Sequence, residues 1–163
     1  MKSKTLLCVL FFFVCGISIQ YGIADDFDWP RWRGPNGDGI SQETDWNPEA
    51  LAGGLKILWK TNVELGSSNI VIRGEHLYVI GNNFSGDDIV FCLNVETGKE
   101  VWRYSYPCGM GNGGDGPQTA QAVDGKHVYT LSVEGHVFCF NAKNGKVRWE
   151  RDLVNNYVVL FIS

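Results

Sequence analysis

The chain has 163 residues, a formal net charge of −4, 20 glycines and six tryptophans. An acidic chain without a run of basic residues is not typical of proteins that bind nucleic acid, so that class is excluded. The Gly-rich and Trp-rich composition, without capped helical patterns, indicates an all-β protein.

Residues 1–24 are predicted to be a signal peptide. Lys2 and Lys4 precede the apolar run TLLCVLFFFVCGISI (5–19), and GIA (22–24) places small residues before a cleavage site at Asp25. The apolar run has about 15 residues, whereas a membrane-spanning helix needs about 20. We therefore expect export to the periplasm or the extracellular space, with no stable membrane span after cleavage.

Cleavage would leave 139 residues, which is enough for one modest domain, and three cysteines. The loss of two lysines would make the net charge −6. An odd number of cysteines does not make a disulfide framework. Cys92 and Cys139 have phenylalanine neighbours and are expected to be buried structural thiols. Cys108 lies in a Gly-rich segment and is the candidate for a reactive or intermolecular thiol.

Residues 25–55 are predicted to form an N-terminal leader. Within it, GPNGDGISQETD (34–45) half fits a calcium loop, with Asn36 and Asp38 at ligand positions. Gly34 stands where the first carboxylate is needed, and Asp45 replaces the bidentate glutamate. We interpret the segment as a polar turn.

Residues 56–153 contain an internal repeat. The segment RGEHLYVIGNNFSGDDIVFCLNVETGKEVW (73–102) returns as DGKHVYTLSVEGHVFCFNAKNGKVRW (124–149). Trp59 is a third copy of the repeated tryptophan. The extra residues of the first copy fall in the polar stretch NNFSGDD (82–88), where a hairpin loop lengthens at little cost.

Each copy shows three strand patterns, with β-branched and aromatic residues in alternation. The predicted strands are 76–81, 88–95 and 100–106 in the first copy and 127–132, 136–142 and 147–153 in the second. Gly-centred turns at ETGK (96–99) and KNGK (143–146) join the second and third strands. The period of 43 to 47 residues favours β-propeller blades, each an antiparallel meander of three to four strands. The repeated tryptophans are expected to dock one blade on the next.

The segment from Cys92 to Trp102, Cys-x-Asn-x-x-Thr-Gly-Lys-x-x-Trp, and its copy at 139–149 resemble the tryptophan-docking motif of quinoprotein-type (PQQ-like) β-propellers. That motif is written Ala-x-Asp-x-x-x-Gly-Lys-x-x-Trp, so cysteine stands here at the Ala position and asparagine, Asn94 and Asn141, at the Asp position. The segments 28–41 and 114–131 also resemble these proteins, although Thr119-Ala120 stands where relatives often have Thr-Pro.

Closed propellers of this type usually have four to eight blades. The resemblance therefore implies an all-β, incomplete propeller of about two to three four-stranded antiparallel blades. We expect the N-terminal part of a longer propeller, with a divergent tail at 154–163 that indicates truncation. The alternative is a small protein that completes its ring by oligomerising.

We assign no functional site to four further patterns. GMGNGG (109–114) fits Gly-x-Gly-x-x-Gly, but no helical pattern follows it, which favours a loop between blades. His76 and His127 occupy equivalent repeat positions and are expected on the surface of hairpins, since zinc needs three or four ligands. Lys99 and Lys146 are expected to be solvated turn residues. NFS (83–85) is a glycosylation sequon.

The resemblance is compatible with two functions. The first is an exported binding or assembly scaffold, whose partner is a protein or polymer ligand at the propeller rim. The alternative is an N-terminal fragment of a PQQ-dependent dehydrogenase. Such enzymes bind the quinone with calcium and show a vicinal Cys-Cys, a tryptophan platform and an aspartate base. No Cys-Cys occurs here, so we assign no catalytic, cofactor-binding or metal residue and no cofactor, and the prediction leans against an enzyme.

Overall fold

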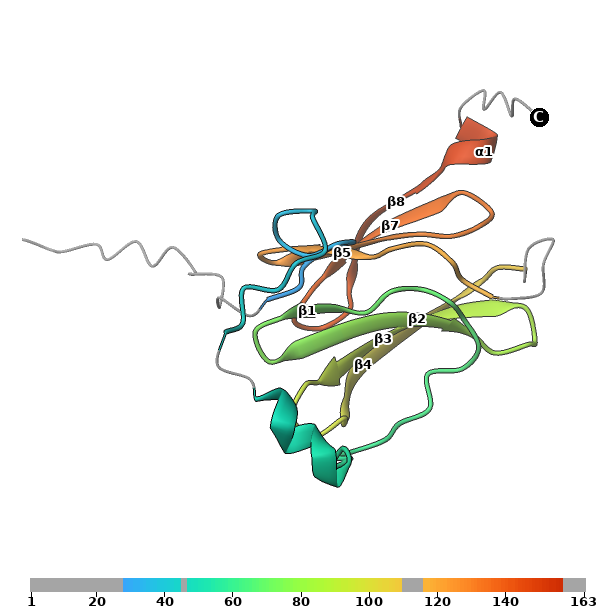
Figure 1. The fold of residues 1–163 in the computed structure, drawn as a ribbon. Coiled ribbons are helices and arrows are strands. Elements are labelled where there is room, and N and C mark those ends of the chain that lie inside the picture. Colours follow the sequence, from blue (N-terminus) through green and yellow to red (C-terminus); the bar gives the residue numbers. More distant parts are fainter. Residues whose placement is uncertain (1–27, 45–46, 110–115, 157–163) are drawn as a thin grey trace, which may run out of the picture.

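A computed structural model describes residues 28–44, 47–109 and 116–156. The predicted signal peptide, most of GMGNGG and the end of the predicted tail lie outside these residues. Two four-stranded antiparallel sheets make up the described chain (Figure 1). None of the described helices is long and apolar enough to cross a membrane.

The strands follow one another in the order of the sequence, so each sheet is a simple meander. The first sheet contains β1 (Val71–Arg73), β2 (His76–Asn82), β3 (Asp87–Asn94) and β4 (Glu100–Pro107). The second sheet contains β5 (Ala122–Asp124), β6 (His127–Leu131), β7 (His136–Asn141) and β8 (Val147–Asp152). Outside the sheets lie a 3₁₀ helix η1 (Pro48–Gly53) and a short helix α1 (Leu153–Asn156).

The six predicted strands are confirmed within one or two residues at their ends. The innermost strands, β1 and β5, were not predicted individually. Each has only three residues, so alternation cannot reveal them, although the expected meander of three to four strands allowed for a fourth. Both tight turns are present, and Gly98 and Gly145 adopt positive φ angles there.

The two sheets share one hydrophobic core. Residues of β2, β3 and β4 that point to one face of the first sheet pack on residues of β6 and β7 from the second sheet. The buried members include Tyr78, Val90, Cys92, Trp102, Val128, Phe138 and Phe140. Because this cluster fills the space between the sheets, each sheet buries a face that it could not bury alone.

The other face of the first sheet has its own cluster of buried side chains, Leu77, Val79, Ile89, Phe91 and Leu93. The extended segment around Trp59 and Val63 covers this cluster and precedes β1 in the chain. Trp59 donates a hydrogen bond from Nε1 to the carbonyl of Val95 at 2.9 Å. The first sheet is therefore covered on both faces.

Tryptophan docking joins the elements, as the sequence predicted. The Trp102 ring lies over Gly145 in the turn of the second sheet, and a Cβ placed on that glycine would come within 2.6 Å of the ring. Its Nε1 donates to the carbonyl of Ala142 at 2.8 Å. Trp59 lies over Gly98 in the same way, with a hypothetical Cβ at 2.4 Å. Each tryptophan thus contacts the turn of the following sheet.

The start of the leader crosses the inner strands of both sheets. Trp29 forms an antiparallel bridge with Ile72 of β1, and the carbonyl of Pro30 accepts a hydrogen bond from Val123 of β5 at 2.8 Å. Buried Asp28 accepts from the Gly74 amide at 2.6 Å and pairs with Arg73 at 3.2 Å. These contacts satisfy part of the polar backbone at the inner edges of the two sheets.

Candidate functional site

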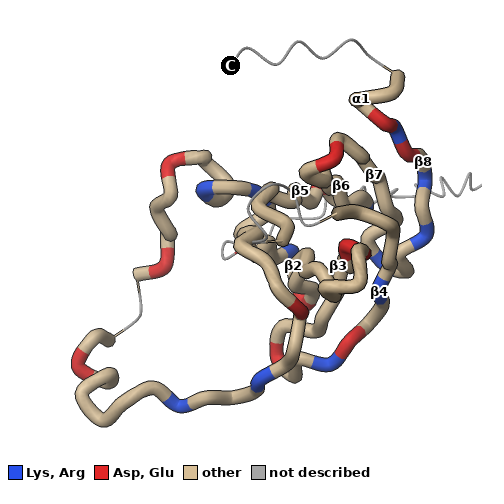
Figure 2. The backbone as a smooth tube through the Cα atoms, turned by 90° about the vertical axis from the view of Figure 1, so that its right-hand side faces the viewer, with Lys and Arg blue, Asp and Glu red and all other residues tan. Residues whose placement is uncertain are grey.

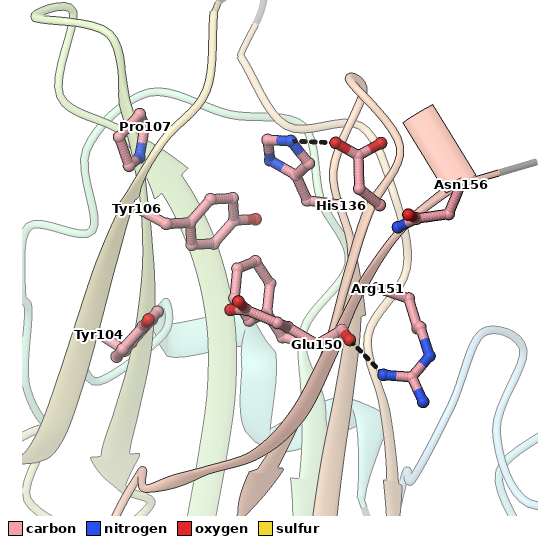
Figure 3. A pocket seen from close by; sticks show the side chains of 9 residues that line it. Tyr104, Tyr106, Pro107, His136, Glu150, Arg151 and Asn156 are labelled. Atoms are coloured by element: carbon pink, nitrogen blue, oxygen red, sulfur yellow. Dashed lines mark hydrogen bonds and ion pairs between the residues drawn. The ribbon is translucent and has the colours of Figure 1, made fainter. Parts of the chain in front are cut away.

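A groove of about 810 Å³ opens between the outer strands β4 and β8, where the two sheets diverge (Figure 3). These strands are the outermost members of their sheets, and each pairs with only one neighbour among the described strands. Most charged residues lie in the leader, the turns and these outer strands rather than between the sheets (Figure 2). The groove combines aromatic, acidic, basic and amide side chains.

The aromatic wall of the groove comes from both sheets. Tyr104 and Tyr106 are two residues apart on β4, so both side chains point toward the second sheet, where they contact Phe138 of β7. The Phe138 ring centroid lies 5.7 Å from that of Tyr104 and 4.6 Å from that of Tyr106. Phe138 and Tyr106 are almost completely buried, so only part of each ring borders the groove.

The acidic side of the groove comes from β8. In Figure 3 the Glu150 side chain extends toward the tyrosines, whereas Arg151 points away from them. Phe138 and Glu150 are direct cross-strand partners in the β7–β8 ladder. The Arg151 guanidinium lies 6.0 Å from the centre of the Trp149 ring and donates to the Glu150 carbonyl at 2.7 Å.

Asp152 ends β8 and caps helix α1. Its carboxylate accepts hydrogen bonds from the backbone of Asn155 at 2.9 Å and of Val154 at 3.0 Å, and from the Asn155 side chain. The pKa of Asp152 is held below its ordinary value, and the hydrogen bonds from Asn155 are the largest cause. His136 lies 3.6 Å from the same carboxylate. Asp152 is therefore a fixed anion at one end of the groove.

A buried polar cluster lies behind Tyr106. Asp88 is 1 % exposed and accepts a hydrogen bond from the Asn82 amide at 2.9 Å and from the Tyr106 hydroxyl at 3.4 Å. The Asn82 amide also donates to the Cys108 carbonyl at 3.1 Å. Burial, together with the Asp88 charge, raises the pKa of Tyr106 far above its ordinary value. The cluster therefore fixes Tyr106 as a neutral hydrogen-bond donor.

Cys108 corrects one prediction from the sequence. It was the candidate for an accessible thiol, but its side chain is buried at 1 % exposure between the end of β4 and the second sheet. Burial, with Asp88 as the second cause, raises the pKa of Cys108 to about 11. A thiol in this state is poorly nucleophilic at neutral pH. The prediction of a reactive or intermolecular thiol is wrong.

The other two thiols are buried, as predicted. Cys92 and Cys139 occupy equivalent positions and are 0 % and 2 % exposed. Each is the cross-strand partner of the equivalent tyrosine of its own sheet, Tyr78 or Tyr129. All three described cysteines are free.

The remaining candidate residues of the sequence stay apart from the groove. His76 and His127 begin β2 and β6 and lie beside tyrosines of their own strands. Lys99 and Lys146 are exposed at the turns, as predicted. Asp38 accepts a hydrogen bond from the Ile40 amide at 2.9 Å, which is the local geometry of a polar turn.

The motif asparagines have a structural role. Asn94 Oδ1 accepts from the Thr97 amide at 3.0 Å, and Asn141 Oδ1 accepts from the Lys143 amide at 3.0 Å. Asn83 of the sequon donates from Nδ2 to Asp87 at 3.1 Å, so the nitrogen that a glycan would modify is engaged within the loop.

The groove residues were missed by the sequence analysis because they belong to different sheets. Tyr104 and Glu150 are distant in sequence, and neither forms part of a recognisable motif. One signal was available. The repeat alignment pairs Glu150 with Arg103, which places opposite charges at equivalent positions of the two copies.

Comparison with known proteins identifies the architecture. A family model described as "Outer membrane protein assembly factor BamB" matches residues 86–159. The europium-containing methanol dehydrogenase superposes with a TM-score of 0.64 at 14 % identity, over 78 % of this chain and 23 % of that one. The quinohemoprotein alcohol dehydrogenase from Comamonas testosteroni superposes with a TM-score of 0.63 at 19 % identity, over 80 % of this chain and 20 % of that one.

The two sheets have the fold of β-propeller blades, and they resemble those of PQQ-like propellers. The described part contains two such blades, which do not close into a ring, and the chain spans about a fifth of the length of the matched dehydrogenases. A search of curated protein sequences found no match. At these identities the structural likeness establishes the fold alone.

Within the described chain, the second blade presents an uncovered docking face. Trp149 occupies the position of Trp102, beside Tyr129 at a ring distance of 6.1 Å, but it is 41 % exposed, whereas Trp102 is 8 % exposed. Among the described residues no glycine turn lies against Trp149. The groove and this face are on opposite sides of the second blade.

Proposed function

We propose that the chain is part of an exported PQQ-like β-propeller that acts as a binding or assembly scaffold. In this proposal residues 1–24 direct export, 25–55 form the leader, 56–153 form the blades and 154–163 form a divergent tail. A protein or polymer ligand docks on a rim of the propeller. The family model named for an assembly factor supports this class of function.

The observation that carries the proposal is the hairpin between β2 and β3. Its tip displays Phe84, which is 69 % exposed and has a φ angle of 61°. A non-glycine residue in the left-handed region is strained, and such strain persists only where the surroundings hold it in place. An exposed aromatic ring on a rigid loop is typical of the anchor residues in protein interfaces.

Side-chain hydrogen bonds hold this loop rigid. The Asn82 side chain accepts from the Phe84 amide at 3.0 Å, and the Asn83 side chain accepts from the amides of Ser85 and Asp87 at 2.9 and 3.1 Å. The corresponding hairpin of the second blade is shorter and carries Val133. The extra residues of the first blade therefore form an ordered loop that exposes Phe84.

A dehydrogenase fragment is the second candidate, favoured by the superposition on two quinone-type dehydrogenases. The buried carboxylates of the described chain do not fit a calcium or quinone site. Asp28 is committed to Arg73 and the Gly74 amide, and Asp88 to Asn82 and Tyr106. We derive no catalytic step from them.

Photo-crosslinking in the producing cell tests the scaffold. A photoreactive amino acid at position 84 is expected to yield a discrete crosslinked product, whereas the same group at Val133, on the corresponding hairpin of the second blade, serves as the matched control. Equal labelling at both positions, or none at either, would contradict the proposal.

In parallel, pyrroloquinoline quinone with calcium is titrated into the full chain. Saturable quenching of tryptophan fluorescence together with alcohol-dependent dye reduction would favour the dehydrogenase.

A further inference from the structure

We propose that the groove between β4 and β8 binds the cationic side chain, lysine or arginine, of an extended peptide segment of the partner. The inference rests on the scaffold function and names the chemistry of one contact. Its basis is a difference between the two blades at equivalent positions.

The first blade carries its own cation at this place. Arg103 of β4 is the cross-strand partner of Phe91, and its guanidinium carbon lies 5.5 Å from the centre of the Phe91 ring. This is a cation–π contact, in which the negative face of the ring attracts the positive charge. The Glu100 carboxylate pairs with the same guanidinium, with a hydrogen bond of 2.9 Å.

The second blade has the ring without the cation. Phe138 corresponds to Phe91, but its cross-strand partner is Glu150. A carboxylate gains nothing from the negative face of an aromatic ring. Glu150 and the part of the Phe138 ring that borders the groove therefore lie together, and a positive group between them would interact favourably with both.

The surroundings favour a cation from another molecule. Arg151, the neighbouring positive side chain on β8, also lines the groove, but its guanidinium lies over Trp149 and points away from the tyrosines (Figure 3). Asp152 adds a second carboxylate, fixed by its contacts with Asn155. Glu150, Asp152 and the tyrosine wall face the groove, whereas its two basic lining residues are already engaged: His136 lies beside Asp152, and Arg151 donates to the Glu150 carbonyl.

The walls of the groove also suit an extended backbone. β4 and β8 each have one edge that pairs with no other described strand, so backbone groups along these edges can bond a peptide, apart from the Glu150 carbonyl, which accepts from Arg151. Peptides that add to a sheet edge bind through the main chain and are selected by pockets for alternate side chains. A groove of about 810 Å³ is large enough for one such side chain and its neighbours.

Isothermal titration calorimetry with the full chain tests the inference. The probe is the peptide acetyl-Thr-Val-Lys-Val-Thr-amide, compared with the same peptide carrying norleucine instead of lysine. We expect the lysine peptide to bind about tenfold more tightly, since it alone makes the ion pair and the cation–π contact. Its affinity should fall as salt increases. Equal affinities, or no binding of the lysine peptide, would overturn the inference.

Two substitutions at one position sharpen the test. Glu150→Gln keeps the size of the side chain and is expected to weaken the lysine peptide about threefold, whereas Glu96→Gln, at an exposed turn of the first blade, should leave it unchanged. Glu150→Arg places in the second blade the arrangement that Arg103 has in the first. It should abolish binding of the lysine peptide without lowering the melting temperature.

The outcomes separate this inference from the scaffold function. If the lysine peptide fails to bind while crosslinks from position 84 persist, the cation site is wrong and the scaffold stands. If both fail, both are wrong. Binding of a neutral oligosaccharide such as maltotriose, without binding of the lysine peptide, would instead make the groove a carbohydrate site and overturn the inference. Unchanged binding in Glu150→Arg would place the peptide elsewhere.

Discussion

At the scale of single residues, the pairing of glycine with tryptophan decides how the blades meet. Gly98 and Gly145 have φ angles of 65° and 67°, and each supports the ring of a tryptophan that comes earlier in the chain. Glycine is needed at each of these positions for two reasons. The turn requires a left-handed conformation, and the tryptophan ring occupies the space that a Cβ would fill. Neither requirement is visible in a hydrophobicity pattern, yet both follow from the repeated Gly-Lys-x-x-Trp.

The two requirements can be separated by mutation. Gly125→Ala and Gly145→Ala both force alanine into a left-handed turn, which costs about 1 kcal/mol. Only Gly145→Ala also drives a methyl group into the Trp102 ring, because nothing lies within 4 Å of a Cβ at Gly125. We expect Gly145→Ala to lose about 1–3 kcal/mol more in the free energy of unfolding. Urea denaturation measures both, and equal losses would contradict the docking role.

Buried thiols make the stability depend on alkaline pH. Burial raises the pKa of Cys92 from 9.0 to about 12, so the folded state keeps this proton where the unfolded chain releases it. The stabilising effect is complete below pH 9 and is lost as the pH rises toward 12. We expect the urea midpoint to fall as the pH rises from about 9 toward 12.

Cys92→Ala provides the control for this prediction. The variant is expected to be less stable at neutral pH, because it leaves a small cavity, but its midpoint should fall less with pH. An identical fall in the variant and the parent would assign the pH dependence to other groups. Tyr78, whose pKa is also raised by burial, acts at higher pH than the thiol.

Sequence reasoning succeeded for thiols whose neighbours explain their burial and failed for Cys108. Phe91 and Phe138 precede Cys92 and Cys139 directly, so local composition shows the apolar surroundings. Cys108 is followed by a Gly-rich segment, and the groups that enclose it, Asp88 among them, come from other strands. Burial that depends on distant segments cannot be predicted from a local pattern.

At the scale of elements, the strands of the meander were predictable, whereas the contacts between elements were only partly so. The pattern of β-branched and aromatic residues identified β2, β3, β4 and their copies, because each has five or more residues. The groove was not predictable, since Tyr104 and Glu150 meet only when two sheets are stacked. The cover over the first blade was suggested only by the position of Trp59.

Docking between elements predicts unequal effects for two equivalent tryptophans. Trp102→Phe removes the hydrogen bond to the Ala142 carbonyl and opens space over Gly145, which should cost about 2 kcal/mol. Trp149→Phe changes an exposed ring and should cost less than about 0.5 kcal/mol. Chemical denaturation of the two variants checks the difference. Equal losses would show that Trp149 is as firmly held as Trp102.

At the scale of the whole molecule, two blades enclose one core and leave two apolar surfaces uncovered within the described chain. One is the face of the second blade that carries Trp149, and the other is the segment with exposed Leu55, Ile57 and Leu58. The groove opens on neither surface, because it lies between the two blades. A partner in the groove and a neighbour on Trp149 would therefore occupy different sides of the second blade.

The stagger between tryptophan and glycine also has an evolutionary consequence. The first blade supplies Gly98 to the segment before it, where Trp59 lies, and Trp102 to the blade after it, where Gly145 lies. A gene segment that encodes one repeat, copied in tandem, would encode both the glycine and the tryptophan of the contact between blades. Descendants of such an array can thus gain or lose whole units without inventing a new interface, and each copy is then free to exchange a charge, as Arg103 and Glu150 illustrate.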